Sequence, residues 1–274
     1  MRLAERAYGD QISARVLAVD KLRNDAGFDP FGFDPETARR ALALLTFFHR
    51  TYFRTQVFGL GNVTDDNVLF VANHSGHVPI DATIIATALV LDRDPPLLVR
   101  SMVEKWAQEL PFVSTVFPRL GQVLGTPENA RRLLCAGSSL LVFPEGVRGI
   151  SKPFSKRYRL ERFGPGFMRL ALETRKPIVP VAVIGAEEQY PALGNLRGAA
   201  RWLGMPSLPI IPQLFFGVPL PLPTRYRIYF GQPLAFDGDP DDDDTEIERR
   251  VALVRSTIQR MLYRGVSERK SVFW

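Results

Sequence analysis

The sequence has a single cysteine, Cys135, and only three histidines, His49, His74 and His77. A lone cysteine cannot form an internal disulfide, so no covalent framework supports the fold, and the composition fits a reducing compartment. These residues are too few soft ligands for a closed tetrahedral zinc site. A mixed site of histidines and carboxylates is the alternative that this count leaves open, and we expect no metal.

Motifs for nucleotide binding and for a serine nucleophile are absent as well. The sequence contains no GxxxxGK[ST] loop and no GxGxxG turn, so we expect no bound nucleotide cofactor. It also contains no GxSxG elbow. Ser75 lies beside His74, but without the glycines that place a nucleophilic serine on a sharp turn between strand and helix. The sequence therefore does not favour a covalent serine mechanism.

No long apolar run is free of proline. The 22 residues 202–223 carry no charge and contain six prolines, which exclude the continuous helix that a bilayer requires. The residues after Met1 lack the apolar core of a signal peptide. We expect no leader and no spanning helix. Segment 202–223 is either a proline-rich loop packed over the core or an apolar lip that dips into a membrane surface.

Basic residues outnumber acidic ones, 35 to 29, and their distribution is uneven. Residues 237–248 contain eight acidic and no basic side chains, whereas residues 148–176 contain nine basic and two acidic ones. The basic segment suits anionic lipid headgroups, a phosphorylated substrate or nucleic acid. Because no basic recognition helix and no basic motif with interleaved aromatic residues is found, we expect no nucleic-acid partner.

Predicted strands and helices alternate along most of the chain, which predicts an α/β fold with a largely parallel mixed sheet flanked by helices. Residues 1–34 are predicted to be an N-terminal extension, 35–236 the main domain, and 237–274 an acidic loop and an amphipathic helix packed on that domain. Strands are expected at 68–73, 97–99, 120–125, 138–146, 177–186 and 226–234. Helices are expected at 35–53, 81–91, 104–117, 127–137, 164–177 and 245–264.

The loop NHSGHVPID, residues 73–81, gathers two histidines and a carboxylate directly after a predicted strand. An imidazole is the natural general base at neutral pH, and a carboxylate on its Nδ1 fixes the tautomer and stabilises the imidazolium. Asp81 is placed to supply that carboxylate. The structural alternative is that Asp81 only caps a helix and His77 is only a loop residue. His49, alone inside a predicted helix, is expected to have a structural role.

A second polar loop, FPEGVRG at residues 143–149, also follows a predicted strand. Gly146 and Gly149 free the backbone there. Glu145 is an isolated carboxylate at the strand end, and Arg148 carries a guanidinium suited to phosphate or carboxylate. A surface turn with a Glu–Arg pair is the structural alternative. Because sites in such sheets form beyond the carboxyl ends of strands, we expect both loops at one edge of the sheet.

Together these blocks resemble a known family. NHSGHVPID, FPEGVRG and IVPVAVIGAEE occur in this order with intervening helices, as in the phospholipid/glycerol acyltransferase superfamily of lysophosphatidic acid acyltransferase-like enzymes. The resemblance spans at least residues 57–235 and implies a single domain of that fold.

The resemblance implies that His74 is the catalytic base and that Asp81 orients it. The commonest family pattern places the aspartate five positions after the histidine, where this chain has Pro79. Asp81 lies seven positions after His74, the spacing of a subfamily with an NHSGxxPxD loop, which this chain resembles. His77, four positions before Asp81, is expected in the substrate-binding site and is the alternative partner of Asp81.

The resemblance also assigns binding roles. It implies that Glu145, Gly146 and Arg148 bind the phosphate or glycerol end of the acceptor, and that Pro180, in the last block, supports the site or the acyl donor. The arginine-bearing block usual between these motifs is represented only by FPRLGQVLGT. No role is therefore carried over to Arg119.

The implied reaction moves a fatty acyl group from acyl-CoA or an acyl carrier protein to a hydroxyl of a glycerolipid or lysophospholipid. The acyl thioester is a co-substrate, and no cofactor is expected. A peripheral position on the cytoplasmic side of a membrane, through the helix at 35–53 and segment 202–223, would bring the lipid acceptor within reach. The alternatives are a non-catalytic lipid-binding or lipid-transfer protein and a thioesterase that uses the same His/Asp pair.

Overall fold

The computed structural model describes residues 2–19, 22, 24–64, 67–74, 80–105, 113–196, 198, 209–215, 217 and 220–273. The α-helices are α1 (Arg2–Val19), α2 (Pro35–Phe47), α3 (Ile80–Leu91), α5 (Val113–Arg119), α6 (Pro127–Cys135), α7 (Val147–Ile150), α8 (Gly166–Thr174), α9 (Ala186–Gln189), α11 (Pro212–Phe215) and α12 (Asp244–Ser267). Shorter helices of other types are η1 (Phe48–Tyr52), η2 (Leu60–Asn62) and η3 (Phe154–Lys156). The strands are β1 (Gln56–Phe58), β2 (Leu69–Ala72), β3 (Val99–Val103), β4 (Val123–Leu124), β5 (Ser139–Val142), β6 (Ile178–Ile184), β7 (Gly194–Asn195), β8 (Pro209–Ile210) and β9 (Arg227–Phe230).

Within the described residues, seven strands form one sheet in the order β1-β9-β6-β2-β5-β3-β4. All neighbouring strands are parallel except β6 and β9, which run antiparallel. Strands β7 and β8 form a separate antiparallel pair. The predicted α/β class, with a largely parallel mixed sheet flanked by helices, is confirmed.

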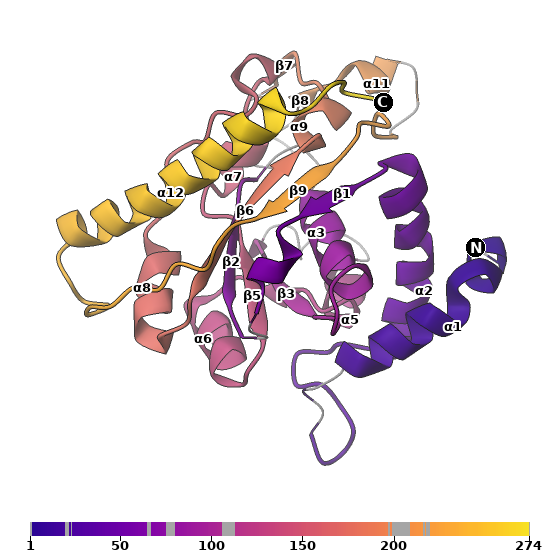
Figure 1. The fold of residues 1–274 in the computed structure, drawn as a ribbon, viewed down its shortest axis with the longest axis horizontal. Coiled ribbons are helices and arrows are strands. Elements are labelled where there is room, and N and C mark those ends of the chain that lie inside the picture. Colours follow the sequence, from indigo (N-terminus) through magenta and orange to yellow (C-terminus); the bar gives the residue numbers. More distant parts are fainter. Residues whose placement is uncertain are drawn as a thin grey trace.

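Helices cover both faces of this sheet (Figure 1). On one face, α6, α8 and α12 pack against alternate side chains of the strands, such as Leu69, Val71 and Ile178. On the other face, α3 packs against the side chains between them, such as Phe70 and Val179. Both sides of the central strands are therefore buried, which is why these strands read as continuous apolar runs in the sequence.

The N-terminal extension is packed against the main domain. Helices α1 and α2 pack together against the C-terminal end of α3 (Figure 1), where Ile12, Val16 and Leu42 lie beside Val90. The Arg15 guanidinium donates to the backbone oxygen of Val90 across 3.1 Å. These contacts stabilise α1, because a helix in a protein owes most of its stability to tertiary packing rather than to its own sequence.

The C-terminal helix lies against the sheet on the face opposite α3 (Figure 1). Its buried side chains recur at helical spacing: Ile247, Val251, Val254, Ile258 and Leu262. A Cβ at Gly265 would lie 2.3 Å from Ile184 and 2.6 Å from Tyr229, so this glycine lets the last turns of α12 approach β6 and β9.

Short polar signals set where helices begin. The Asp34 side chain accepts a hydrogen bond from the Thr37 amide across 3.0 Å, and Pro35 is the first residue of α2, so Asp34 is the N-cap of this helix. Thr126 caps α6 in the same way before Pro127. The helix predicted at 35–53 changes type after Phe47, because residues 48–52 continue as the π-helix η1.

One strand prediction is corrected, and one strand of the main sheet was not predicted. The strand predicted at 97–99 is β3, and it begins at Val99 and ends at Val103, since the Leu97 amide instead donates to the oxygen of Leu89 in α3. The strand was misplaced because Arg100, a charged residue, interrupts its apolar pattern. Arg100 is nevertheless buried, and an ion pair with Asp29 compensates its charge. Strand β1 was not predicted, because it is three residues long and half-buried.

Candidate active site

The two polar loops meet at one edge of the sheet, as predicted. Strands β2 and β5 are parallel neighbours, with Leu69 opposite Leu140 and Val71 opposite Val142. Parallel neighbours end at the same edge, so the loop that begins at Asn73 and the loop at 143–149 emerge side by side. Residues 75–79 of the first loop, His77 and Pro79 among them, lie outside the described residues.

His74 and Asp81 form a hydrogen-bonded pair. The His74 Nδ1 lies 2.9 Å from Oδ2 of Asp81, whose side chain is fully buried in the first turn of α3. The other Asp81 oxygen accepts the amide of Ala82. The His74 ring stacks on Phe143 with 4.3 Å between ring centroids, and its side chain is 14% exposed. With Nδ1 engaged, Nε2 is the nitrogen that can take a proton from a substrate.

Glu145 is fully used by the protein itself. Its Oε1 accepts the backbone amide of His74 across 3.0 Å, and its Oε2 accepts the amide of Glu161 across 2.8 Å. The Lys152 ammonium lies 3.4 Å from Oε2, and the carboxylate is buried. Glu145 therefore joins the two loops and presents no exposed oxygen to a ligand.

Arg148 is the exposed member of this loop. One of its Nη2 hydrogens reaches the backbone oxygen of Arg162 across 3.2 Å. A guanidinium has five N–H donors, and this is the one hydrogen bond that Arg148 makes among the described residues, so its exposed donors could bind an anionic group. Gly146 adopts φ +55° directly before α7, a conformation that favours glycine.

Pro180 lies away from these loops. It is buried in the middle of β6, opposite Val71, and its oxygen accepts the Gly231 amide. A Cβ at Gly231 would lie 2.7 Å from Pro180 Cγ. None of its described contacts reaches His74, so the structure places Pro180 in the sheet that supports the site.

The model of the Acyltransferase family matches residues 54–184, which contain both loops and β6. An uncharacterized protein of Mycobacterium tuberculosis is 38% identical over 267 residues, covering 93% of this chain and 74% of that protein. The chain belongs to the phospholipid/glycerol acyltransferase superfamily. The resemblance seen in the three sequence blocks is thereby confirmed.

More distant matches differ in what their names describe. A chicken protein named DGAT1/2-independent enzyme synthesizing storage lipids is 23% identical over 206 residues, 74% of this chain and 59% of that protein. The crystal structure of the 1-acyl-sn-glycerophosphate (LPA) acyltransferase PlsC from Thermotoga maritima matches with a TM-score of 0.51 and 17% identity, covering 96% of this chain and 90% of that one. This second match shows a shared fold.

Two residues that support the site have structural roles that the sequence did not indicate. Asn73 is fully buried and bonds to both backbone groups of Val183 in β6, at 2.7 and 3.1 Å. Gly149 was singled out only for backbone freedom. A Cβ there would lie 2.9 Å from the His74 oxygen and 2.9 Å from Glu145 Cβ. Both residues fix the path of the chain at His74.

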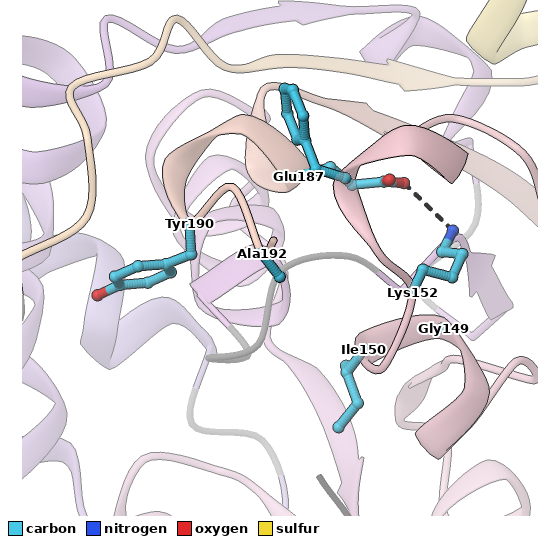
Figure 2. A pocket seen from close by; sticks show the side chains of 7 residues that line it. Gly149, Ile150, Lys152, Glu187, Tyr190 and Ala192 are labelled. Carbon is cyan, nitrogen blue, oxygen red and sulfur yellow. Dashed lines mark hydrogen bonds and ion pairs between the residues drawn. The ribbon is translucent and has the colours of Figure 1, made fainter. Parts of the chain in front are cut away.

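Lys152 and Glu187 were missed for a different reason. Lys152 was counted in the basic segment, yet it is buried and its ammonium lies 3.2 Å from Oε1 of Glu187. Figure 2 shows the two side chains pointing toward each other beside a small pocket, whose lining includes Gly149, Ile150, Tyr190 and Ala192. Burial raises the pKa of Glu187 from 4.5 to about 7, and Lys152 opposes the shift. No sequence spacing joins residues that are 35 positions apart.

A second His/Asp pair lies elsewhere in this acyltransferase. His49, in η1, is buried and its Nε2 lies 2.7 Å from Oδ2 of Asp92, just after α3. The pair joins η1 to the end of α3 and shares no described contact with His74. Clusters of three or more histidine, cysteine, aspartate or glutamate residues suited to a metal ion are not found in the described ranges.

Proposed function

We propose that this acyltransferase moves a fatty acyl group from an acyl thioester, either acyl-CoA or an acyl carrier protein, to a hydroxyl of a glycerolipid or lysophospholipid. The observation that carries the proposal is the hydrogen bond of 2.9 Å between His74 Nδ1 and the buried Asp81. A histidine oriented in this way is a general base poised to act at neutral pH.

In the proposed reaction, His74 Nε2 takes the proton of the acceptor hydroxyl as its oxygen attacks the thioester carbonyl. The new C–O bond forms, the C–S bond breaks, and the proton passes from the imidazolium to the leaving thiolate. Asp81 holds the tautomer that leaves Nε2 free and stabilises the imidazolium. A positioned general base contributes about 10²- to 10⁴-fold in rate.

In the loop at 143–149, we propose that the exposed Arg148 binds the substrate. Arg148 would contact the phosphate or glycerol end of the acceptor, and Gly146 would shape the turn that presents it. Since both Glu145 oxygens are engaged, its proposed part is to hold the His74 loop beside the bound acceptor. Pro180 would act through the sheet that supports His74. His77 remains the alternative base.

A membrane surface is the proposed source of the lipid acceptor. Described residues of the two segments proposed to rest on it are in contact, because the Tyr52 hydroxyl donates to the oxygen of Pro221 across 2.6 Å. Apolar side chains near them are exposed, namely Leu44, Phe47 and Leu220. Within the described residues, no helix is both long and apolar enough to cross a membrane. We propose peripheral contact on the basis of these exposed apolar side chains.

The direct test is thiol release from palmitoyl-CoA, and from an acyl carrier protein thioester, by the wild type and His74→Ala. A panel of lysophospholipids, mono- and diacylglycerols serves as acceptors, and mass spectrometry identifies the lipid products. His49→Gln is the matched control because it alters the other His/Asp pair. His77→Ala tests the alternative base. Release that needs an acceptor, yields an acylated lipid and disappears in His74→Ala is expected.

Two other outcomes would contradict this proposal. Thiol release that depends on His74 but not on an acceptor would identify a thioesterase. No release from either donor, together with binding of the lipid by the wild type and His74→Ala, would identify a non-catalytic lipid-binding protein. Loss of release in His77→Ala, with activity kept in His74→Ala, would reassign the base.

A further inference from the structure

Lys152 is a buried cation between two buried carboxylates. Its Nζ lies 3.4 Å from Oε2 of Glu145 and 3.2 Å from Oε1 of Glu187, and it also donates to the backbone oxygen of Arg159 across 3.1 Å. Its side chain is 3% exposed. A buried charge that loses its partner is costly, so these three groups depend on each other.

Contacts through Lys152 connect the catalytic loop to β6 and α9. The His74 amide bonds to Glu145 on one side, and on the other side Oε2 of Glu187 accepts the amide of Tyr158 across 3.0 Å. Glu187 lies in α9, directly after β6. Figure 2 shows Lys152 and Glu187 pointing toward each other from two different segments of the chain. The cluster therefore spans three separate stretches of the chain.

We propose that Lys152 and Glu187 are positioning residues for acyl transfer: Lys152 holds Glu145 in the place from which it fixes His74, and the charges of Lys152 and Glu187 set the proton affinity of the His74 imidazole. The part of this inference that concerns acyl transfer rests on the proposed function. Neither side chain contacts the reacting atoms. They act through Glu145, and through a field that burial leaves weakly screened.

The charge of the cluster changes near neutral pH. Burial raises the pKa of Glu187 to about 7, with Lys152 opposing and the Glu145 carboxylate adding to the rise. Above that pH Glu187 adds a negative charge to the cluster, and below it Glu187 is mostly neutral. The charged and titratable groups around Glu187 come from several elements, and they are Lys152, Glu145, Tyr158, Glu188 and Arg269.

Removing the charge of Lys152 and removing that of Glu187 should shift the pH profile in opposite directions. Lys152→Met removes a positive charge that lies 3.4 Å from the carboxylate bonded to the His74 amide, and its loss should favour the imidazolium. The acidic limb of the pH profile of kcat/KM should therefore move to higher pH, by roughly half a unit to one unit, with kcat lowered about tenfold or more. Glu187→Gln removes a negative charge, so its limb should move to lower pH. This second shift is smaller, because Glu187 is only partly ionised below pH 7.

The experiment measures these profiles on the full chain, with Lys270→Met and Glu128→Gln as exposed controls that should leave the limb in place. A second readout does not need turnover. The chain has three histidines, so the Cε1–H signal of His74 can be assigned in NMR spectra by comparison with His74→Ala and titrated in each variant. If the wild type acylates nothing, the proposed function fails, while the NMR titration still decides this inference.

Opposite shifts in the two variants, with unmoved controls, would support the inference. Shifts in the same direction, or no shift, would overturn it, since a purely structural role for the cluster does not predict opposite signs. If Lys152→Met does not fold, Glu187→Gln decides alone. A titration moved to lower pH then supports the inference, and an unmoved one overturns it.

Discussion

The backbone amide of His74 donates to Oε1 of Glu145 across 3.0 Å, so a buried carboxylate of one loop holds the chain of the other. The same carboxylate accepts the amide of Glu161. Two sequence motifs that are 71 residues apart thereby form one unit. The position of His74 depends on groups that never touch a substrate, and this dependence can be measured.

Asp81→Asn should lower kcat for acyl transfer about 10²- to 10⁴-fold, with a small effect on folding. An asparagine keeps the size of the side chain, but it neither stabilises the imidazolium nor fixes the tautomer with Nε2 free. Steady-state kinetics and thermal unfolding check this. Asp92→Asn, at the partner of His49, is the matched control. Activity of Asp81→Asn within threefold of the wild type would rule out the proposed pair.

Gly149→Ala should lower kcat about tenfold or more while the protein stays folded. The new Cβ would lie 2.9 Å from the His74 oxygen and 3.0 Å from His74 Cβ, so the histidine must move. A displacement of about 1 Å is enough to cost about 10²-fold in rate. Gly166→Ala is the control, because nothing lies within 4 Å of its Cβ. Equal activity in both variants would contradict the packing argument.

Asn73→Ala should lower the free energy of unfolding by about 2 to 4 kcal/mol, because it leaves the buried N–H and C=O of Val183 without their partner. Urea unfolding measures this. Asn129→Ala is the comparison, since the Asn129 side-chain amide donates to a single backbone oxygen, that of Leu124. A loss in Asn73→Ala no greater than in Asn129→Ala would show that the bridge from β2 to β6 is not a major support.

Glu187 should make the folded protein less stable as the pH rises. Burial raises its pKa from 4.5 to about 7. Between these values the folded state keeps a proton that the unfolded state has lost, so stability falls with rising pH and then levels off. Relative to Glu187→Gln, the wild type should lose up to about 3 kcal/mol between pH 4.5 and pH 7.

Urea unfolding of both proteins at several pH values gives this difference, and other titrating groups cancel in it. Glu128→Gln, at an exposed glutamate of α6, is the control and should track the wild type. A difference between wild type and Glu187→Gln that does not change with pH would show that Glu187 titrates in its ordinary range.

Leu44→Glu and Phe47→Glu should weaken binding to anionic vesicles at low salt. The side chains are 49% and 44% exposed on α2, the helix proposed to rest on the membrane. A carboxylate there removes apolar burial and repels anionic lipid. Vesicle co-sedimentation measures the effect. Leu253→Glu, also 49% exposed but on α12, is the control. Equal loss in all three variants, or no binding by the wild type, would exclude this surface.

Much of the fold followed from local patterns. The apolar runs that became β2, β5 and β6 are buried on both faces, and a strand of that kind needs little information beyond its own sequence. The starts of α2 and α6 were predicted at Pro35 and Pro127, because proline is favoured at the first position of a helix, a signal that acts over a few residues. Strand β3 was predicted at the wrong residues, because it contains a buried arginine whose charge is compensated by Asp29, a residue distant in sequence.

For the candidate site, the sequence by itself determined which residue types stand after β2 and β5, and the parallel sheet rule placed them at one edge. That was enough to indicate His74 and Asp81, which lie within one loop and one helical turn. Only the tertiary structure decided that Glu145 faces inward, that Lys152 is buried, and that Glu187 is its partner. The physical reason is that burial and charge pairing depend on chain segments distant in sequence, and no local pattern records which of them will meet.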